Sequence, residues 1–280
     1  MIETTIVGWN GTDHDRAVIE WALAHAPDSK LLLVRVEPHA SSTIETFASG
    51  SPAAAARLAL NEETERVRQA HPLVTVDSQL VTGNPAEELA RFSRPNTLVA
   101  VGTRRTHGGA ARFGWSVGAR LAGNAHGPVA IVPPGDLAGR SGIVVGVDGS
   151  EASEVALDVA AAEANSTGQT VQAIRAWQAP SPWTDSGLVD LEYLRSLEEM
   201  YGHILDDSVE RVADAYPDLR IQRSLVAGQP AHVLVEASEG ATLLIVGNHG
   251  ARGITRFLLG SVSHSVILNA VSPVVVVRAD

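Results

Sequence analysis

The chain has 280 residues and a mass of 29.4 kDa, a length typical of about two domains. Hydrophobic residues make up 45% of it and charged residues 19%, a balance that excludes a mainly disordered chain. Lys and Arg number 21 against 32 Asp and Glu, and this net charge of -11 argues against a nucleic-acid partner. Because the chain has no Cys, disulfide scaffolds, Cys-ligated metal sites and thiol catalysis are excluded.

Membrane, secretion and metal-binding signals are also missing from the sequence. No apolar run approaches the roughly 18 residues that a membrane helix needs. The start, Met1-Ile2-Glu3-Thr4-Thr5, lacks the basic and then apolar regions of a signal peptide. The 10 His residues are scattered and form no His-Glu-x-x-His pair, so we expect no dedicated metal site. We therefore expect a cytoplasmic protein without a membrane partner.

The sequence contains an internal duplication. Four segments recur in the same order: residues 4–12 and 142–150, 80–86 and 225–231, 97–102 and 242–247, and 127–132 and 272–277. Ordered matches with a small drift in offset indicate duplication of a unit of about 140 residues. Residues 133–142 are rich in Pro and Gly and predict a short linker, so we expect domains at 1–135 and 141–280.

Short apolar runs alternate with helical patterns within each unit. In the second unit the runs are 143–147, 171–177, 221–226, 243–246 and 274–277, and the helical patterns are 153–164, 193–215, 231–237 and 262–270. Runs rich in Val and Ile, apolar on both faces, are typical of buried parallel strands. The alternation predicts an α/β fold of two tandem, doubly wound, parallel five-stranded sheets. In such sheets, ligands bind beyond the carboxyl ends of the strands.

Asp148 follows the first apolar run of the second unit, within Gly146-Val147-Asp148-Gly149-Ser150. A carboxylate at this end of a strand can accept hydrogen bonds from the two hydroxyls of a ribose. Asp and Ser are also frequent in turns and at helix N-caps, so Asp148 could equally open a turn while Ser150 caps the next helix. The sequence leaves both interpretations open.

A glycine-rich segment follows the fourth apolar run of the second unit. Gly247 and Gly250 would let a ligand approach the main chain, and Gly260-Ser261 stands directly before the helical pattern that begins at Val262. The unpaired N–H groups and the positive dipole end of a helix start bind anions. The segment between the fourth apolar run and the next helix thus contains two glycine-rich elements, the second at a helix start. This combination favours a polyphosphate site over glycines that serve only to form turns. The segment is neither a Walker A loop nor a dinucleotide Gly-x-Gly-x-x-Gly motif.

The spacing Gly247, two residues, Gly250, nine residues, Gly260-Ser261 resembles the ATP-binding signature of universal stress proteins. The segments at 145–150, 228–230 and 272–277 agree, so the resemblance covers essentially the whole chain. It implies a tandem universal stress protein of the ATP-binding subclass, with an adenine nucleotide alpha hydrolase-like fold in each half. It also implies ATP as the ligand, with Mg²⁺ carried by the phosphates, and a role in the stress response.

The resemblance implies a role for each matching position of the second half. Asp148 would hold the ribose, while main-chain groups at Gly146 and Ala176 would frame the adenine. Val246 would pack near the base, and Gly247 would approach the ribose and phosphates. The residues implied around the triphosphate are Gly250, Gly260, Ser261 and Val262, with Val147 and Ser263 as further contacts.

The first half departs from this pattern. Asn10 stands at the position of Asp148, which keeps an acceptor but loses the charge. The second and third glycines are replaced by Arg105 and Trp115, and an indole would obstruct the chain approach that glycine permits. A gap of one residue would instead align Arg112-Phe113 with Arg256-Phe257, so two alignments of this segment remain.

The corresponding first site would consist of Gly8, Asn10, Val36, Gly102 and Ser116. Arg104 and Arg105 would still attract phosphate through their charge. We expect an altered first site and one strong nucleotide site per chain.

An ATP-binding regulatory module is the leading function. The alternatives are a slow ATPase or autophosphorylating phosphotransferase that uses the same pocket, and a scaffold with two vestigial sites. We find no catalytic residue, because no general base is well placed and only Arg252 and Arg256 could act as an arginine finger. The apolar runs 129–132 and 274–277 predict edge strands. The resemblance to universal stress proteins implies that these strands pair the two domains within the chain or form a homodimer.

Overall fold

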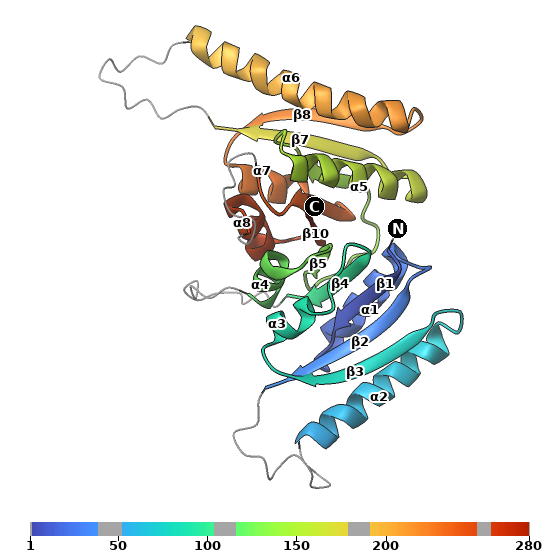
Figure 1. Cartoon of the computed structure of the whole chain (residues 1–280). Coiled ribbons are helices and arrows are strands. Elements are labelled where there is room, and N and C mark those ends of the chain that lie inside the picture. The colour runs from blue at the N-terminus through green and yellow to red at the C-terminus, as the bar shows by residue number, and fades with distance from the viewer. Residues whose placement is uncertain (1, 39–51, 104–115, 179–190, 251–258, 280) are drawn as a thin grey trace. The chain divides into compact units, whose positions relative to one another are not determined.

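The computed structural model describes residues 2–38, 52–103, 116–178, 191–250 and 259–279 (Figure 1). The chain separates into two compact units, Met1–Pro134 and Gly135–Asp280. Each unit has its own buried core, so each is described by itself.

The first unit alternates strands and helices along its described residues. Its elements are β1 (Thr4–Gly8), α1 (Asp13–His25), β2 (Lys30–Glu37), α2 (Pro52–Ala70), β3 (Val76–Thr82), α3 (Pro85–Ala90), β4 (Thr97–Gly102), α4 (Val117–Asn124) and β5 (Val129–Val132). The strands lie in the order β3-β2-β1-β4-β5, and each neighbouring pair is parallel. The first strand therefore lies inside the sheet, and the connections diverge on either side of it.

The second unit repeats this arrangement. Its elements are β6 (Ile143–Gly146), α5 (Glu151–Thr167), β7 (Val171–Trp177), α6 (Leu191–Ala215), β8 (Ile221–Ala227), α7 (Pro230–Ala237), β9 (Leu243–Gly247), α8 (Ser261–Asn269) and β10 (Val274–Val277). The strand order is β8-β7-β6-β9-β10, again with parallel neighbours. The predicted doubly wound α/β fold is confirmed.

Helices cover both faces of each sheet because the central strands are apolar on both sides. In the second unit, α5 and α6 pack together on one face, while α7 and α8 pack together on the other. All residues of β9 and β10 are buried, as is typical of a parallel strand between two helical layers. This double cover leaves the carboxyl ends of β6 and β9 as the place where connections separate to opposite faces.

The predicted element bounds are close to those of the structure. Strands β7 and β10 have the predicted bounds. Helix α8 begins at Ser261 rather than Val262, because Gly260 is its N-cap and the Gly260 carbonyl accepts the first helical hydrogen bond from the His264 N–H at 2.9 Å. Ser261 thus belongs to the helix instead of preceding it.

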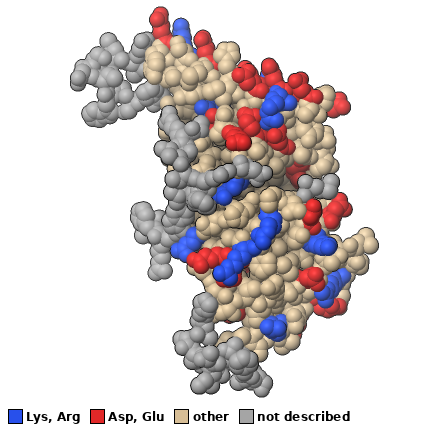
Figure 2. Space-filling model, in the orientation of Figure 1, with Lys and Arg blue, Asp and Glu red and all other residues tan. Residues whose placement is uncertain are grey.

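The surface charge agrees with the acidic composition. Helix α6 carries seven Asp or Glu against two Arg, and acidic side chains gather over it in Figure 2. Arg211 joins α6 to α5 through ion pairs with Glu154 at 2.9 Å and Asp158 at 2.7 Å. The helical layer over β7 and β8 therefore presents an anionic outer surface.

His25, at the end of α1, makes the stability of the first unit depend on pH. Its ring stacks on Trp21 with centroids 4.2 Å apart, and its Nδ1–H donates to the Trp21 carbonyl at 2.8 Å. Burial lowers the pKa of His25, and the bond to Trp21 only partly opposes this. A lowered pKa in the folded state stabilises the fold above the ordinary histidine value near 6.5, and this stabilisation is lost as the pH falls through the lower folded value.

We therefore expect His25→Gln to reduce the loss of stability between pH 7.5 and pH 5.5. Urea unfolding of the wild type and the variant at both values measures this. An unchanged pH dependence in the variant would contradict the assignment to His25.

Candidate functional site

The turn after β6 confirms that Asp148 opens a turn and that Ser150 caps the next helix, while the ribose contact of Asp148 stays a prediction. The Oδ1 atom of Asp148 accepts hydrogen bonds from the Ser150 N–H at 3.0 Å and from the Ser150 hydroxyl at 2.5 Å. Ser150 in turn caps α5, since its hydroxyl oxygen accepts from the Ser153 N–H at 3.2 Å. The second carboxylate oxygen, Oδ2, lies 2.5 Å from the position that a Cβ atom would take on Gly250. One oxygen thus builds the turn while the other faces the glycine-rich segment.

The main chain after β9 is fixed by bonds to both neighbouring elements. The Asn248 N–H donates to the Val277 carbonyl at 2.7 Å, and the Asn248 carbonyl accepts from the Gly260 N–H at 2.7 Å. The Ser263 hydroxyl donates to the Gly247 carbonyl at 2.5 Å. These bonds hold the start of α8 against the carboxyl end of β9. The hydroxyl of Ser263 is buried in this structural role, while Ser261 is exposed.

Gly260 permits the close approach between this helix start and the turn. A Cβ atom on Gly260 would lie 3.2 Å from the Asn248 carbonyl oxygen and 3.4 Å from the His249 Cα. No described side chain caps α8 at Gly260. The first N–H groups of α8 therefore keep their capacity to bind an anion.

The residues predicted for the base lie at the carboxyl ends of three neighbouring strands. Gly146 ends β6 and pairs with Ile174 of β7, and Ala176 lies two residues further along β7. Val246 is buried in β9 and pairs with Val276. The predicted set of the second unit is therefore brought to one edge of the sheet, except that residues 251–258 of the loop lie outside the described residues.

The sequence patterns give Asn248 and Arg278 no role at this edge, and they leave His249 as either a phosphate contact or a solvated loop residue. Asn248 is buried and joins β9, β10 and α8 through its main chain. The Nε2 atom of His249 is buried and has no hydrogen-bond partner among the described residues. Burial and then the positive charge of Arg278 lower the pKa of His249. Arg278 directly follows β10, which pairs with β9. This pairing brings the charge of Arg278 close to His249, which follows β9.

In the turn after β1 the hydrogen-bonding carboxylate belongs to Asp15 of the following helix, not to the turn residue Asn10. Asn10 is exposed, and its N–H donates to the carboxylate of Asp15 at 3.1 Å. The same Asp15 oxygen accepts from the Thr12 N–H at 2.9 Å and the Thr12 hydroxyl at 2.8 Å, which completes a capping box at the start of α1. At the matching position the second unit has Ser153. The first unit thus has its carboxylate in the buried first turn of the helix, whereas the second unit has it in the turn before the helix.

The start of α4 also differs from the start of α8. Ser116 is the N-cap of α4, and its hydroxyl oxygen accepts from the Ala119 N–H at 3.1 Å. The helix start of the first unit thus satisfies one of its own N–H groups, which leaves less capacity for an anion. Buried Leu121 and Ala122 match buried Val266 and Ile267 at an offset of 145, which aligns Ser116 with Ser261 without a gap. Arg104, Arg105 and residues 112–115 lie outside the described residues.

His14 occupies the carboxyl ends of β4 and β5. Its Nε2 atom bonds to the Val132 carbonyl at 3.0 Å, and its ring lies against Gly102. The second unit has the smaller Ala152 at the matching position. The other predicted residues of the first site, Gly8 and Val36, lie at the ends of β1 and β2.

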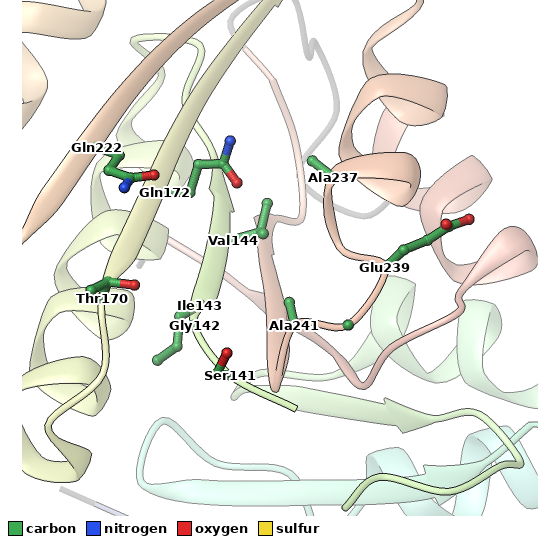
Figure 3. A pocket seen from close by; sticks show the side chains of 11 residues that line it. Ser141, Gly142, Ile143, Val144, Thr170, Gln172, Gln222, Ala237, Glu239 and Ala241 are labelled. Carbon is green, nitrogen blue, oxygen red and sulfur yellow. The ribbon is translucent and has the colours of Figure 1, made fainter. Parts of the chain in front are cut away.

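Of two cavities, one lies away from the edge predicted for the nucleotide, and the other is lined in part by Asn10 of the predicted first site. One, of about 280 Å³, is at the amino ends of β6, β7 and β8, where Gln172 and Gln222 lie side by side (Figure 3). The other, of about 340 Å³, lies in the first unit between Trp9, Arg35 and Ala59. At the position of Ala59 the second unit has Ile204, whose side chain lies 2.8 Å from the Cβ position of Gly149. The second unit fills the corresponding space.

Within the described ranges, no three His, Asp or Glu side chains converge as a protein-bound metal would require. No helix of the described part is both long and apolar enough to cross a membrane.

The fold and the edge geometry define a tandem α/β protein in which each doubly wound unit places a turn and a helix start at the carboxyl ends of its central strands. The model of the universal stress protein family matches residues 1–133 and again residues 140–278. This chain therefore belongs to the universal stress protein family and contains two copies of its domain.

Individual relatives agree along the whole length. Universal stress protein Rv1996 of Mycobacterium tuberculosis is 29% identical over 304 residues, which span 98% of this chain and 94% of that protein. A universal stress protein of Mycolicibacterium smegmatis is 30% identical, with 98% and 96% covered. The crystal structure of a universal stress protein from Archaeoglobus fulgidus aligns with a TM-score of 0.70 at 19% identity, covering 99% of this chain and 97% of that one.

Proposed function

We propose that this chain binds ATP in its second unit and acts as a nucleotide-dependent regulatory module in the stress response. The observation that carries the proposal is the start of α8, which no described side chain caps and which Asn248 holds at the carboxyl end of β9. Such a helix start provides N–H groups and a positive dipole end for phosphate oxygens. The Asp148 carboxylate lies at the same edge and can accept hydrogen bonds from a ribose.

The residues present fit an adenine nucleotide. The N–H groups of α8 and the exposed Ser261 hydroxyl would bind phosphate oxygens, and Asp148 Oδ2 would bind the ribose. Mg²⁺ would be carried by the phosphates, because it binds nucleotides with few protein ligands. The role proposed is binding rather than turnover, since none of the described residues at this edge is identified as a general base.

We expect about one mole of ATP or ADP per chain. The first unit has no carboxylate at Asn10, and Ser116 caps its helix start, so its affinity for ATP should be far lower. Acid release from the purified protein, followed by chromatography and mass measurement, identifies and counts the bound nucleotide. Calorimetry with nucleotide-free protein counts the sites independently.

The possible results separate the candidate functions. Two equal sites at saturation would contradict the assignment of one strong site to the second unit. A preparation that is empty and also ignores added ATP would overturn the proposal in favour of a scaffold. Steady release of phosphate over many turnovers would replace the regulatory module with an ATPase.

A further inference from the structure

We propose that Arg175 is a positioning residue for the ribose contact, acting on Asp148 through the main chain of Val147. The inference rests on the proposed ATP site. It concerns Arg175 and its neighbours, which are not among the residues predicted to contact the nucleotide. Arg175 lies on β7, beside β6 and one residue before Ala176.

The main chain directly before Asp148 is tied to β7 at both of its polar groups. The Val147 N–H donates to the Ile174 carbonyl at 2.9 Å. The Val147 carbonyl accepts from Arg175 Nη1 at 3.4 Å, a long hydrogen bond from a charged donor. Val147 is itself buried, so water has little access to replace this donor. The direction of the peptide leading into Asp148 therefore depends on where the Arg175 guanidinium lies.

Helix α6 holds that guanidinium in place. The Arg175 guanidinium carbon lies 4.8 Å from the centre of the Tyr201 ring, within the range of a cation–π interaction. The Tyr201 ring lies 5.9 Å from the Trp177 ring, which limits its movement. One turn further along α6, Ile204 packs against Gly149, directly after Asp148. Contacts that involve α6 thus fix the chain on both sides of Asp148.

The first unit contains the same arginine in a different arrangement. Arg35 pairs with Leu80 of β3 as Arg175 pairs with Leu225 of β8, so the two arginines occupy equivalent places. The Arg35 guanidinium lies 5.6 Å from the Trp9 ring, and its Nε donates to Glu37 at 2.6 Å. Arg35 is therefore held by a carboxylate of its own strand, and its turn carries Asn10 instead of a carboxylate. The pair of arginines provides a matched control within one chain.

Arg175→Leu should weaken binding of ATP about tenfold, because the loss of a charged hydrogen-bond donor releases the peptide before Asp148. The affinity for 2′,3′-dideoxy-ATP should stay within about twofold of the wild-type value, since this nucleotide lacks the hydroxyls that Asp148 would bind. In an Asp148→Ala background, Arg175→Leu should have no further effect on ATP. Calorimetry with both nucleotides measures each affinity.

Two further variants keep the test informative. Arg35→Leu makes the same change in the first unit and should leave ATP affinity unchanged. Tyr201→Ala removes the ring that holds the guanidinium without altering β7, and it should weaken ATP but not the dideoxy nucleotide. Thermal unfolding verifies that each variant is folded.

The failures of the two proposals are distinguishable. If the wild type binds no ATP, the proposed function and this inference are both overturned. If the wild type binds ATP but Arg175→Leu weakens both nucleotides equally, or neither, only the positioning role is overturned. A selective loss for ATP in Arg175→Leu and Tyr201→Ala, with Arg35→Leu unchanged, supports it.

Discussion

Gly260→Trp is expected to weaken ATP binding at least about a hundredfold, a loss of roughly 2.7 kcal/mol. The Cβ position of Gly260 already lies 3.2 Å from the Asn248 carbonyl oxygen, so an indole has no room on the side of the turn. It would have to lie toward the start of α8 and cover the N–H groups proposed to bind phosphate. The backbone at Gly260 has φ -62° and ψ 152°, which any residue can adopt, so the fold should persist. Calorimetry measures the affinity, and circular dichroism measures the fold.

Asn269→Trp is the control for this substitution. Asn269 is exposed in the last turn of α8, so the same indole there should leave ATP affinity unchanged. Wild-type affinity in Gly260→Trp would show that the nucleotide binds elsewhere. Equal losses in both variants would show that α8 is merely destabilised.

Gly127→Ala should destabilise the first unit by about 3 kcal/mol or more. A Cβ atom at Gly127 would lie 1.8 Å from the Arg94 carbonyl oxygen and 2.9 Å from the Thr97 carbonyl oxygen. Both are main-chain atoms, one in the segment before β4 and one at its first residue, and the Gly127 N–H donates to the buried Ser93 hydroxyl at 2.8 Å. The methyl group therefore requires the main chain to move. Urea unfolding measures the loss.

Gly202→Ala makes the same chemical change where space exists. The nearest atom to its Cβ position is Leu225 Cδ2 at 4.0 Å, and Gly202 lies in the interior of α6. Removing a helix-interior glycine should stabilise the second unit by about 0.5–1 kcal/mol. Unchanged stability in Gly127→Ala would disprove the close approach to Arg94.

The fold could be predicted because its signals are local and occur twice. Buried parallel strands such as β9 and β10 are continuous apolar runs, and each recurs at a fixed offset in the other half. The predicted start of α8 is one residue late, because serine is a preferred N-cap residue but Gly260, not Ser261, occupies the N-cap position. Sequence composition alone does not separate these two positions.

The candidate site could be predicted only where adjacent residues define it. Asp148 and Gly260 stand out because each follows a strand or precedes a helix. The contacts that fix them come from distant segments: Asn248 from β9, Arg175 from β7 and Tyr201 from α6. Such contacts depend on strand order and helix packing, which a single sequence without related sequences does not specify.

The first site illustrates the same limit. The exchange of Asp148 for Asn10 was readable as a loss of charge. That Asp15 takes over as a buried acceptor was not inferred, although Thr12, two residues and Asp15 form a recognisable capping pattern. The role of His14 against Gly102 has no local signal, because it depends on the pairing of β4 with β5.

The buried position of Asp15 limits which charges the turn after β1 can carry. Its carboxylate accepts three hydrogen bonds, one of them from the main chain of Asn10. Replacing Asn10 by Asp would add a second negative charge beside Asp15, and like charges in close proximity are destabilising. The carboxylate of the second unit's turn can therefore be introduced into the first unit without this repulsion only if Asp15 is exchanged together with Asn10.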